Sequence, residues 1–207
     1  MDPNLIPDIL AVTFFLASAI VAPRAFMLYA RVRNPRLFTL GLSMTLVALT
    51  AADNLVMNFF TIPYNTYWFL YIGQTVSFTF ILLSFVKSSD EYLKQLMYWH
   101  IFASMVMIGV LLCSPLLPAF PNNTVRAIAS GSRSIPCFGI FYCYITAFMK
   151  KNTRFSFLMS GAFLLLSLGP WIIIEKYFVS NPDPLDMTGD IIRVIGLIIL
   201  LVAVLGG

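Results

Sequence analysis

The residues best suited to chemistry in this chain are polar side chains set at helical spacing within apolar sequence. One polar face runs along residues 50–61, where Thr50, Asn54, Asn58 and Thr61 recur every three or four positions with Asp53 beside them. A second face, at i, i+4 and i+7, consists of Arg126, Ser130 and Arg133, and Gln74 is an isolated amide in another apolar segment. A pair of guanidinium groups suits a carboxylate or phosphate, since each presents a fork of N–H donors.

These residues predict a binding site for a small polar or anionic ligand. Its candidate residues are Asp53, Asn54, Asn58, Gln74, Arg126, Ser130 and Arg133. Ionisable groups in apolar segments are costly and usually face a bundle interior or a watery cavity. The alternative is that Asp53 pairs with one arginine to fix helix packing. A further charged set is expected to lie at the membrane interface and reach water: Glu175, Lys176, Asp190 and Arg193.

No motif in the chain indicates catalysis, so we predict a protein that is not an enzyme and carries no cofactor. The sequence has no GxSxG context, no HExxH and no glycine-rich phosphate loop. Its one histidine, His100, excludes a haem held by two histidines and is expected to be a hydrogen-bonded residue near the membrane interface. The acidic residues Asp183, Asp186 and Asp190 lie close to Pro182 and Pro184. They are expected to form a solvated turn rather than a metal site.

The elements that must position these residues are membrane-spanning helices. Of the 207 residues, 59% are hydrophobic and 11% are charged, which is too apolar for a soluble domain. A helix needs about 20 apolar residues to cross a bilayer. Seven segments meet this length, at roughly 5–30, 37–60, 66–87, 92–114, 122–149, 154–178 and 188–206. The connections are short, so residues 1–207 are predicted to form one all-α transmembrane domain without strands.

The segment 122–149 is the least regular of the seven, because its first part is polar. We expect a continuous helix buried at the centre of the bundle and kinked at Pro136, with a second kink at Pro170 in the next helix. The alternative is that residues 122–134 form an outer loop or a re-entrant piece.

The connections alternate in charge and predict the orientation of the bundle. Nine of the 13 Lys and Arg residues lie on the side of the odd-numbered connections: Arg24, Arg31, Arg33, Arg36, Lys87, Lys94, Lys150, Lys151 and Arg154. The positive-inside rule makes that side cytoplasmic, so the N-terminus lies outside and the C-terminus inside. The polar residues then lie in the outer half, which predicts a cavity open to the outside above a dry inner half.

The last segment carries a further resemblance. Its sequence Gly189-Asp190-Ile191-Ile192-Arg193-Val194-Ile195-Gly196 is followed by the apolar residues 197–205, at the end of seven short-looped helices. This helix arrangement and the sequence of the last helix resemble the membrane sensor domains at the front of prokaryotic signalling kinases. The resemblance covers the whole chain and implies a prokaryotic cell-membrane protein that signals to a cytoplasmic effector.

We therefore predict a receptor-like, seven-helix membrane module. Its partners are expected to be the lipid bilayer, a small anionic ligand and a cytoplasmic effector, and nucleic acid is not expected. The alternative is a non-catalytic structural or proton-conducting subunit that packs against neighbouring membrane subunits. A small-solute transporter is a third interpretation, which would need a polar path through the inner half.

Overall fold

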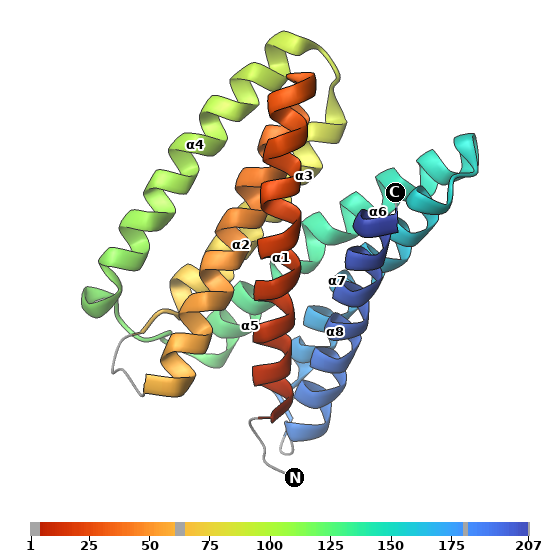
Figure 1. Cartoon of the computed structure of the whole chain (residues 1–207). Helices are drawn as coiled ribbons and strands as arrows, with labels where there is room; N and C mark the ends of the chain where they lie inside the picture. Colours follow the sequence, from red (N-terminus) through yellow and green to blue (C-terminus); the bar gives the residue numbers. More distant parts are fainter. Residues whose placement is uncertain (1–4, 61–64, 180–181, 207) are drawn as a thin grey trace.

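The regular structure of the chain is helical. The computed structural model describes residues 5–60, 65–179 and 182–206, and no strand occurs among them. The helices are α1 (Leu5–Val32), α2 (Pro35–Phe60), α3 (Tyr67–Val86), α4 (Asp90–Leu112), the 3₁₀ helix η1 (Ser114–Leu116), α5 (Asn123–Gly131), α6 (Ser134–Lys151), α7 (Arg154–Glu175) and α8 (Asp183–Gly206) (Figure 1). The all-α fold is confirmed.

Six of these helices are long and apolar enough to cross a membrane, as expected of a multi-pass integral membrane protein. They are α1, α2, α3, α4, α7 and α8. Helix α6 has 18 residues, which corresponds to about 27 Å, slightly less than the bilayer core. Its last turn also contains Lys150 and Lys151. Seven spans therefore remain a prediction, because α6 falls below the length and apolarity of the other six.

The continuous helix predicted over 122–149 is wrong. Helix α5 ends at Gly131 and α6 begins at Ser134, with Ser132 and Arg133 between them. Pro136 then lies in the first turn of α6, where the missing N–H has no intrahelical acceptor to lose. Pro136 therefore lies directly after the break and helps to start a helix, whereas Pro170 lies inside the regular helix α7.

The solvated turn expected at residues 183–190 is also wrong, because these residues form the first two turns of α8. Pro184 is tolerated at the second helical position for the same reason as Pro136. Asp183 and Asp186 lie in the first turn, where carboxylates interact favourably with the positive end of the helix dipole.

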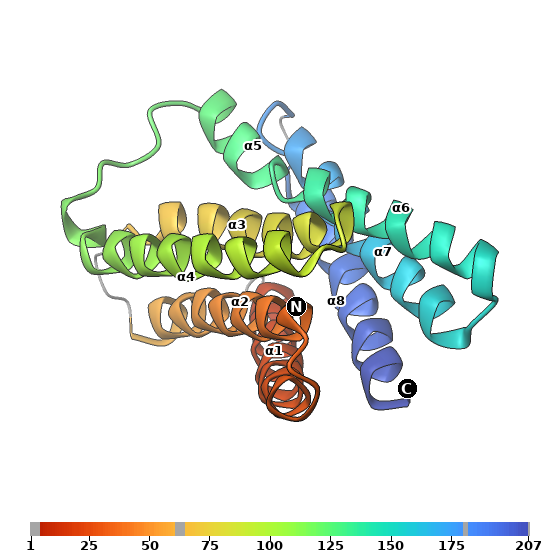
Figure 2. The ribbon, with the colours of Figure 1, turned by 90° about the horizontal axis from the view of Figure 1, so that it is seen from above.

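The helices form two groups that share one core. Helices α1 to α4 pack on one another, α7 packs on α5, α6 and α8, and the groups meet where α1 contacts α8 and α3 contacts α6 (Figures 1 and 2). The shared core includes Phe14 of α1, Val47 of α2, Phe163 of α7 and Leu197 of α8. Because these residues come from both groups, the apolar interior is continuous between them.

The bundle has two chemically different ends. We call the end where α1, α3 and α8 begin and where α2 and α7 end the pocket end. The opposite end, with the connections 33–34, 87–89 and 152–153, is the basic end. In Figure 1 the pocket end is at the bottom, where α1 begins. The basic end is at the top, where α4 begins.

Candidate functional site

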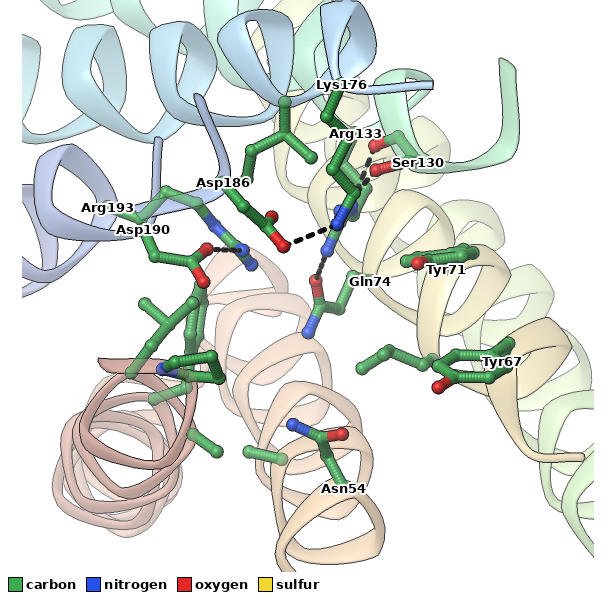
Figure 3. A pocket seen from close by; sticks show the side chains of 17 residues that line it. Asn54, Tyr67, Tyr71, Gln74, Ser130, Arg133, Lys176, Asp186, Asp190 and Arg193 are labelled. Carbon is green, nitrogen blue, oxygen red and sulfur yellow. Dashed lines mark hydrogen bonds and ion pairs between the residues drawn. The ribbon is translucent and has the colours of Figure 1, made fainter. Parts of the chain in front are cut away.

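A cavity of about 170 Å³ lies near the pocket end between the two groups of helices (Figure 3). Its apolar wall comes mainly from α1, including Leu10 and Phe14. The polar lining residues are Asn54, Tyr67, Tyr71, Gln74, Ser130, Arg133, Lys176, Asp186, Asp190 and Arg193. They come from α2, α3, α5, α8, the α5–α6 break and the residue after α7, so tertiary packing assembles the site.

Arg133, at the α5–α6 break, is held by polar groups on two sides. Its Nε donates to the main-chain oxygen of Ser130 at 2.9 Å, and a terminal nitrogen donates to Ser130 Oγ at 3.1 Å. The other terminal nitrogen donates to Gln74 Oε1 at 2.7 Å, and the guanidinium lies 4.8 Å from the centre of the Tyr71 ring. Gln74 in turn donates to Thr50 Oγ1 at 3.3 Å. These contacts fix the guanidinium in one orientation, 4% exposed.

Two ion pairs of the cavity lining involve α8. Asp190 accepts from Arg193 at 3.0 Å, and both side chains are buried. Lys176, just after α7, donates to Asp186 at 2.7 Å, and this pair is partly accessible. Figure 3 shows the Asp190–Arg193 pair across the cavity from Tyr71, whereas Lys176 overlaps Arg133 in this view. The two carboxylates of the lining are therefore already engaged by cations.

The charged side chains that line the cavity do not balance. Three are cations (Arg133, Lys176 and Arg193) and two are carboxylates (Asp186 and Asp190). Among the described residues, no carboxylate lies within ion-pair distance of Arg133, and its partners are neutral oxygens. The lining therefore carries one formal positive charge in excess, centred on Arg133.

A close crossing of α7 and α8 positions Arg193. At Gly169 an added Cβ would lie 2.3 Å from Arg193 Cγ and 2.7 Å from the main-chain oxygen of Gly189. At Gly189 an added Cβ would lie 2.8 Å from the oxygen of Gly169. The two backbones can approach this closely only because neither residue has a side chain, as is common between membrane helices. The arginine stem then lies over Gly169, and its guanidinium lies 5.1 Å from the Phe14 ring centre.

The structure brings four of the seven predicted site residues to this cavity: Asn54, Gln74, Ser130 and Arg133. Arg126 does not line the cavity. Its guanidinium lies over the aromatic ring of Tyr67, 5.9 Å from the ring centroid. Asp53 is half-buried and does not line the cavity, and its buried Oδ2 has no hydrogen-bond partner among the described residues. The alternative pairing of Asp53 with an arginine is not observed in this part of the chain. The side chain of Asn58 lies outside the described residues.

The lining residues Lys176, Asp186, Asp190 and Arg193 were not among the predicted site residues. Asp190 and Arg193 were expected at the interface, yet they are only 6% and 7% exposed within the protein, so that expectation is wrong. Their i, i+3 spacing and the glycines at 189 and 196 were the available signal, because glycines in an apolar helix indicate close packing. Lys176 follows the expectation more closely, as it is partly accessible.

The expectation of a hydrogen-bonded, interfacial His100 is also wrong. The imidazole is fully buried and stacks on Phe80, with ring centroids 4.2 Å apart and planes at 6°. Neither ring nitrogen has a hydrogen-bond partner among the described residues. His100 therefore behaves as an aromatic packing residue of α4.

Comparisons with known proteins give no match to this chain: none with a protein-family model, a curated protein or a solved structure. The cavity itself therefore carries the functional argument.

Proposed function

We propose that this chain is a receptor-like membrane protein that binds a small anion in the cavity at the pocket end. In this proposal Arg133 is the anion-binding residue, and the neutral side chains Asn54, Tyr71 and Gln74 set its specificity. In this proposal the protein has no catalytic role, and binding of the anion is the signal that it detects.

The observation that carries the proposal is the buried charge of Arg133 without a carboxylate. Removing a cation from water costs several kcal/mol unless an opposite charge and hydrogen bonds compensate it. A guanidinium has five N–H groups. Three of them donate to Ser130 and Gln74, which leaves two for a ligand. A carboxylate or phosphate oxygen would supply the missing negative charge.

The dimensions and lining of the cavity limit the anion. A volume of about 170 Å³ suits a ligand of a few heavy atoms rather than a nucleotide or a peptide. The Asp190–Arg193 pair on the far wall adds a second guanidinium, already paired, that can orient a second polar group of the ligand. A small carboxylate or a phosphate monoanion meets these requirements.

The proposed orientation places this cavity outside the cell. The cavity lies at the opposite end of the bundle from Arg33, Lys87 and Arg154, which lie in or next to the connections that the positive-inside rule assigns to the cytoplasm. This orientation has the N-terminus outside, the C-terminus inside and α6 as an additional span between α4 and α7.

The proposed signal runs along α7 and α8 towards the cytoplasm. A ligand biases a conformation only by binding one arrangement better than another. An anion bound at Arg133 and Arg193 would contact both the α5–α6 break and the α7–α8 crossing, so it can favour one packing of these elements. The resemblance to the sensor domains of prokaryotic kinases supports a cytoplasmic effector as the partner.

One observation favours the alternative of a subunit in a larger complex. Helix α4 is the least enclosed of the six spanning candidates and directs large side chains outward: Tyr98, Trp99, Phe102 and Met105. Such a face suits neighbouring helices as well as lipid. A transporter is less favoured, because the core cluster that continues from the cavity into the bundle consists of apolar residues.

Thermal unfolding of the purified protein tests the anion proposal. Sodium acetate, succinate and phosphate are compared with chloride at equal ionic strength. At a concentration of 100 Kd a ligand stabilises the folded state by about 2.7 kcal/mol, so at least one anion is expected to raise the Tm. Arg133→Gln should remove this shift, and Arg126→Gln, outside the cavity, should retain it. No shift with any anion, or a shift that survives in Arg133→Gln, would contradict the proposal.

Cysteine labelling in intact cells tests the orientation. Pro121→Cys, on the connection before α5, and Lys151→Cys, at the basic end, are each made in a Cys113→Ala background. A membrane-impermeant maleimide is expected to label position 121 without permeabilisation and position 151 only after it. The reverse pattern would place the cavity on the cytoplasmic side.

A further inference from the structure

A second hollow, of about 400 Å³, lies where α6 turns into α7 at the basic end, and it shares no lining residue with the anion cavity. It is lined by Phe148, Asn152, Arg154, Phe157 and Leu158. The rings of Phe148 and Phe157 contact each other across the two helices, with centroids 5.2 Å apart. The hollow therefore combines an apolar wall with an amide and a guanidinium.

The polar and apolar lining residues lie at different depths. Helix α7 has 22 residues and is about 33 Å long, close to the thickness of the bilayer core. Arg154 is its first residue, and Asn152 lies in the connection before it, so both lie at the polar boundary of one leaflet. Phe148 and Leu158 lie about one turn further from this boundary, in α6 and α7 respectively. The apolar wall is therefore level with the acyl chains of that leaflet.

The hollow is accessible from the side. The turn between α6 and α7 projects away from α1 to α4 at the basic end (Figures 1 and 2). Phe157 is 57% exposed, and the side chains of Asn152 and Arg154 are exposed as well. A molecule of the surrounding leaflet can therefore reach both the apolar wall and the polar groups.

The charge beside the hollow is positive and has no compensation from this part of the chain. Lys150 and Lys151 are exposed in the last turn of α6, close in sequence to Arg154. None of these three cations lies within ion-pair distance of a carboxylate among the described residues. The sequence has no Asp or Glu between Glu91 and Glu175. A ligand of complementary charge must therefore bring its own anionic group.

From the apolar wall, its depth and the uncompensated cations, we propose that this hollow binds an anionic phospholipid of the leaflet at the basic end. One acyl chain packs against Phe148, Phe157 and Leu158, and the headgroup phosphate accepts hydrogen bonds from Arg154 and Asn152. Basic pockets between membrane helices on the cytoplasmic side bind anionic headgroups in this way. A zwitterionic lipid has the same phosphate and chains but no net charge to offset the lysines. This lipid site goes beyond the anion proposal and does not depend on it.

Competition between two phospholipids tests the site. The purified protein is relipidated with equal amounts of phosphatidylglycerol and phosphatidylcholine that have the same acyl chains, and the lipid retained after detergent washing is quantified by mass spectrometry. The wild type is expected to retain phosphatidylglycerol in at least about fivefold excess. Arg154→Gln should lower this ratio about fivefold, which corresponds to about 1 kcal/mol for one cation near an anionic lipid. Equal retention of the two lipids by the wild type would overturn the proposal.

Two further variants separate a defined site from general attraction to the basic end. Arg31→Gln removes an exposed cation of the same end that does not line the hollow, and it should leave the ratio unchanged. Phe157→Ala removes part of the exposed apolar wall and should reduce the retained phosphatidylglycerol. An equal fall of the ratio in Arg31→Gln, or full retention in Phe157→Ala, would overturn the proposal.

A soluble phosphate is the other source of the same headgroup chemistry. An excess of glycerol phosphate during relipidation should not displace phosphatidylglycerol, because it has no acyl chain to contact Phe148 and Phe157. Displacement would assign the hollow to a soluble phosphate and overturn the lipid proposal. The anion-induced Tm shift of Arg154→Gln should equal that of the wild type, because Arg154 and Arg133 lie at opposite ends of α6. The two proposals therefore fail separately.

Discussion

The two ends of the bundle treat their charged side chains in opposite ways. At the basic end, Arg33, Lys87 and Lys151 are exposed, and no ion pair occurs there among the described residues. At the pocket end, Arg133, Asp190 and Arg193 are buried: Arg133 donates to Gln74 of α3, and Arg193 pairs with Asp190 within α8. The charged groups at the basic end are therefore stabilised by water, whereas those at the pocket end are stabilised by other groups of the protein.

This comparison indicates where sequence changes should matter. An exposed charge remains solvated whatever its neighbours are, so its energetic contribution is small. A buried charge depends on each partner, because the loss of one leaves the other uncompensated. Effects on stability should therefore decrease from the α8 ion pair, through the glycines that enclose it, to the exposed lysines.

The largest effect is expected from Asp190→Asn. The substitution leaves Arg193 buried without its carboxylate, which costs about 3–5 kcal/mol in comparable buried pairs. Reversible unfolding in mixed detergent measures the free-energy change. The double variant with Arg193→Met should regain most of the loss, because the unpaired charge is removed as well. A loss below about 1 kcal/mol for Asp190→Asn would show that water reaches this pair and would weaken the contrast between the two ends.

An intermediate effect is expected from Gly169→Ala. The new Cβ would lie 2.3 Å from Arg193 Cγ and 2.7 Å from the Gly189 oxygen, so α7 and α8 must separate. Overpacking of this kind costs about 1–3 kcal/mol. Gly161→Ala, on the same helix with no atom within 4 Å of the new Cβ, is the control and should not destabilise the protein. Equal unfolding free energies for the two variants would show that the crossing does not position Arg193.

The smallest effect is expected from Lys150→Gln combined with Lys151→Gln. Both side chains are exposed in the last turn of α6. Surface substitutions of this kind usually change stability by no more than about 0.5 kcal/mol. The same unfolding assay measures the change. A larger destabilisation would show that the basic end contributes to folding as well as to orientation.

Much of the fold is predictable from local sequence. Long apolar runs predict helices because a bilayer leaves the backbone no other way to satisfy its hydrogen bonds. The two errors, at the α5–α6 break and at the start of α8, both involve proline near a helix start. There the missing N–H is harmless, and composition alone does not distinguish a first turn from an interior one.

The candidate site was predictable on one side only. Helical spacing placed Ser130 and Arg133 on one face, and both line the cavity with Gln74. The same spacing also included Arg126, which lies over Tyr67 instead. Arg126 lies one turn before Ser130 in α5, so helical spacing indicates the face but not how far along it the cavity extends.

Local chemistry along the sequence determined the apolar helices, the short connections and the segregation of exposed basic residues to one end. These properties depend on residues close together in the chain and on the bilayer. Tertiary structure alone decided that Asp190 and Arg193 are buried and that Arg133 has no carboxylate partner among the described residues. Burial and pairing depend on atoms contributed by distant segments, so they are settled only when the helices pack.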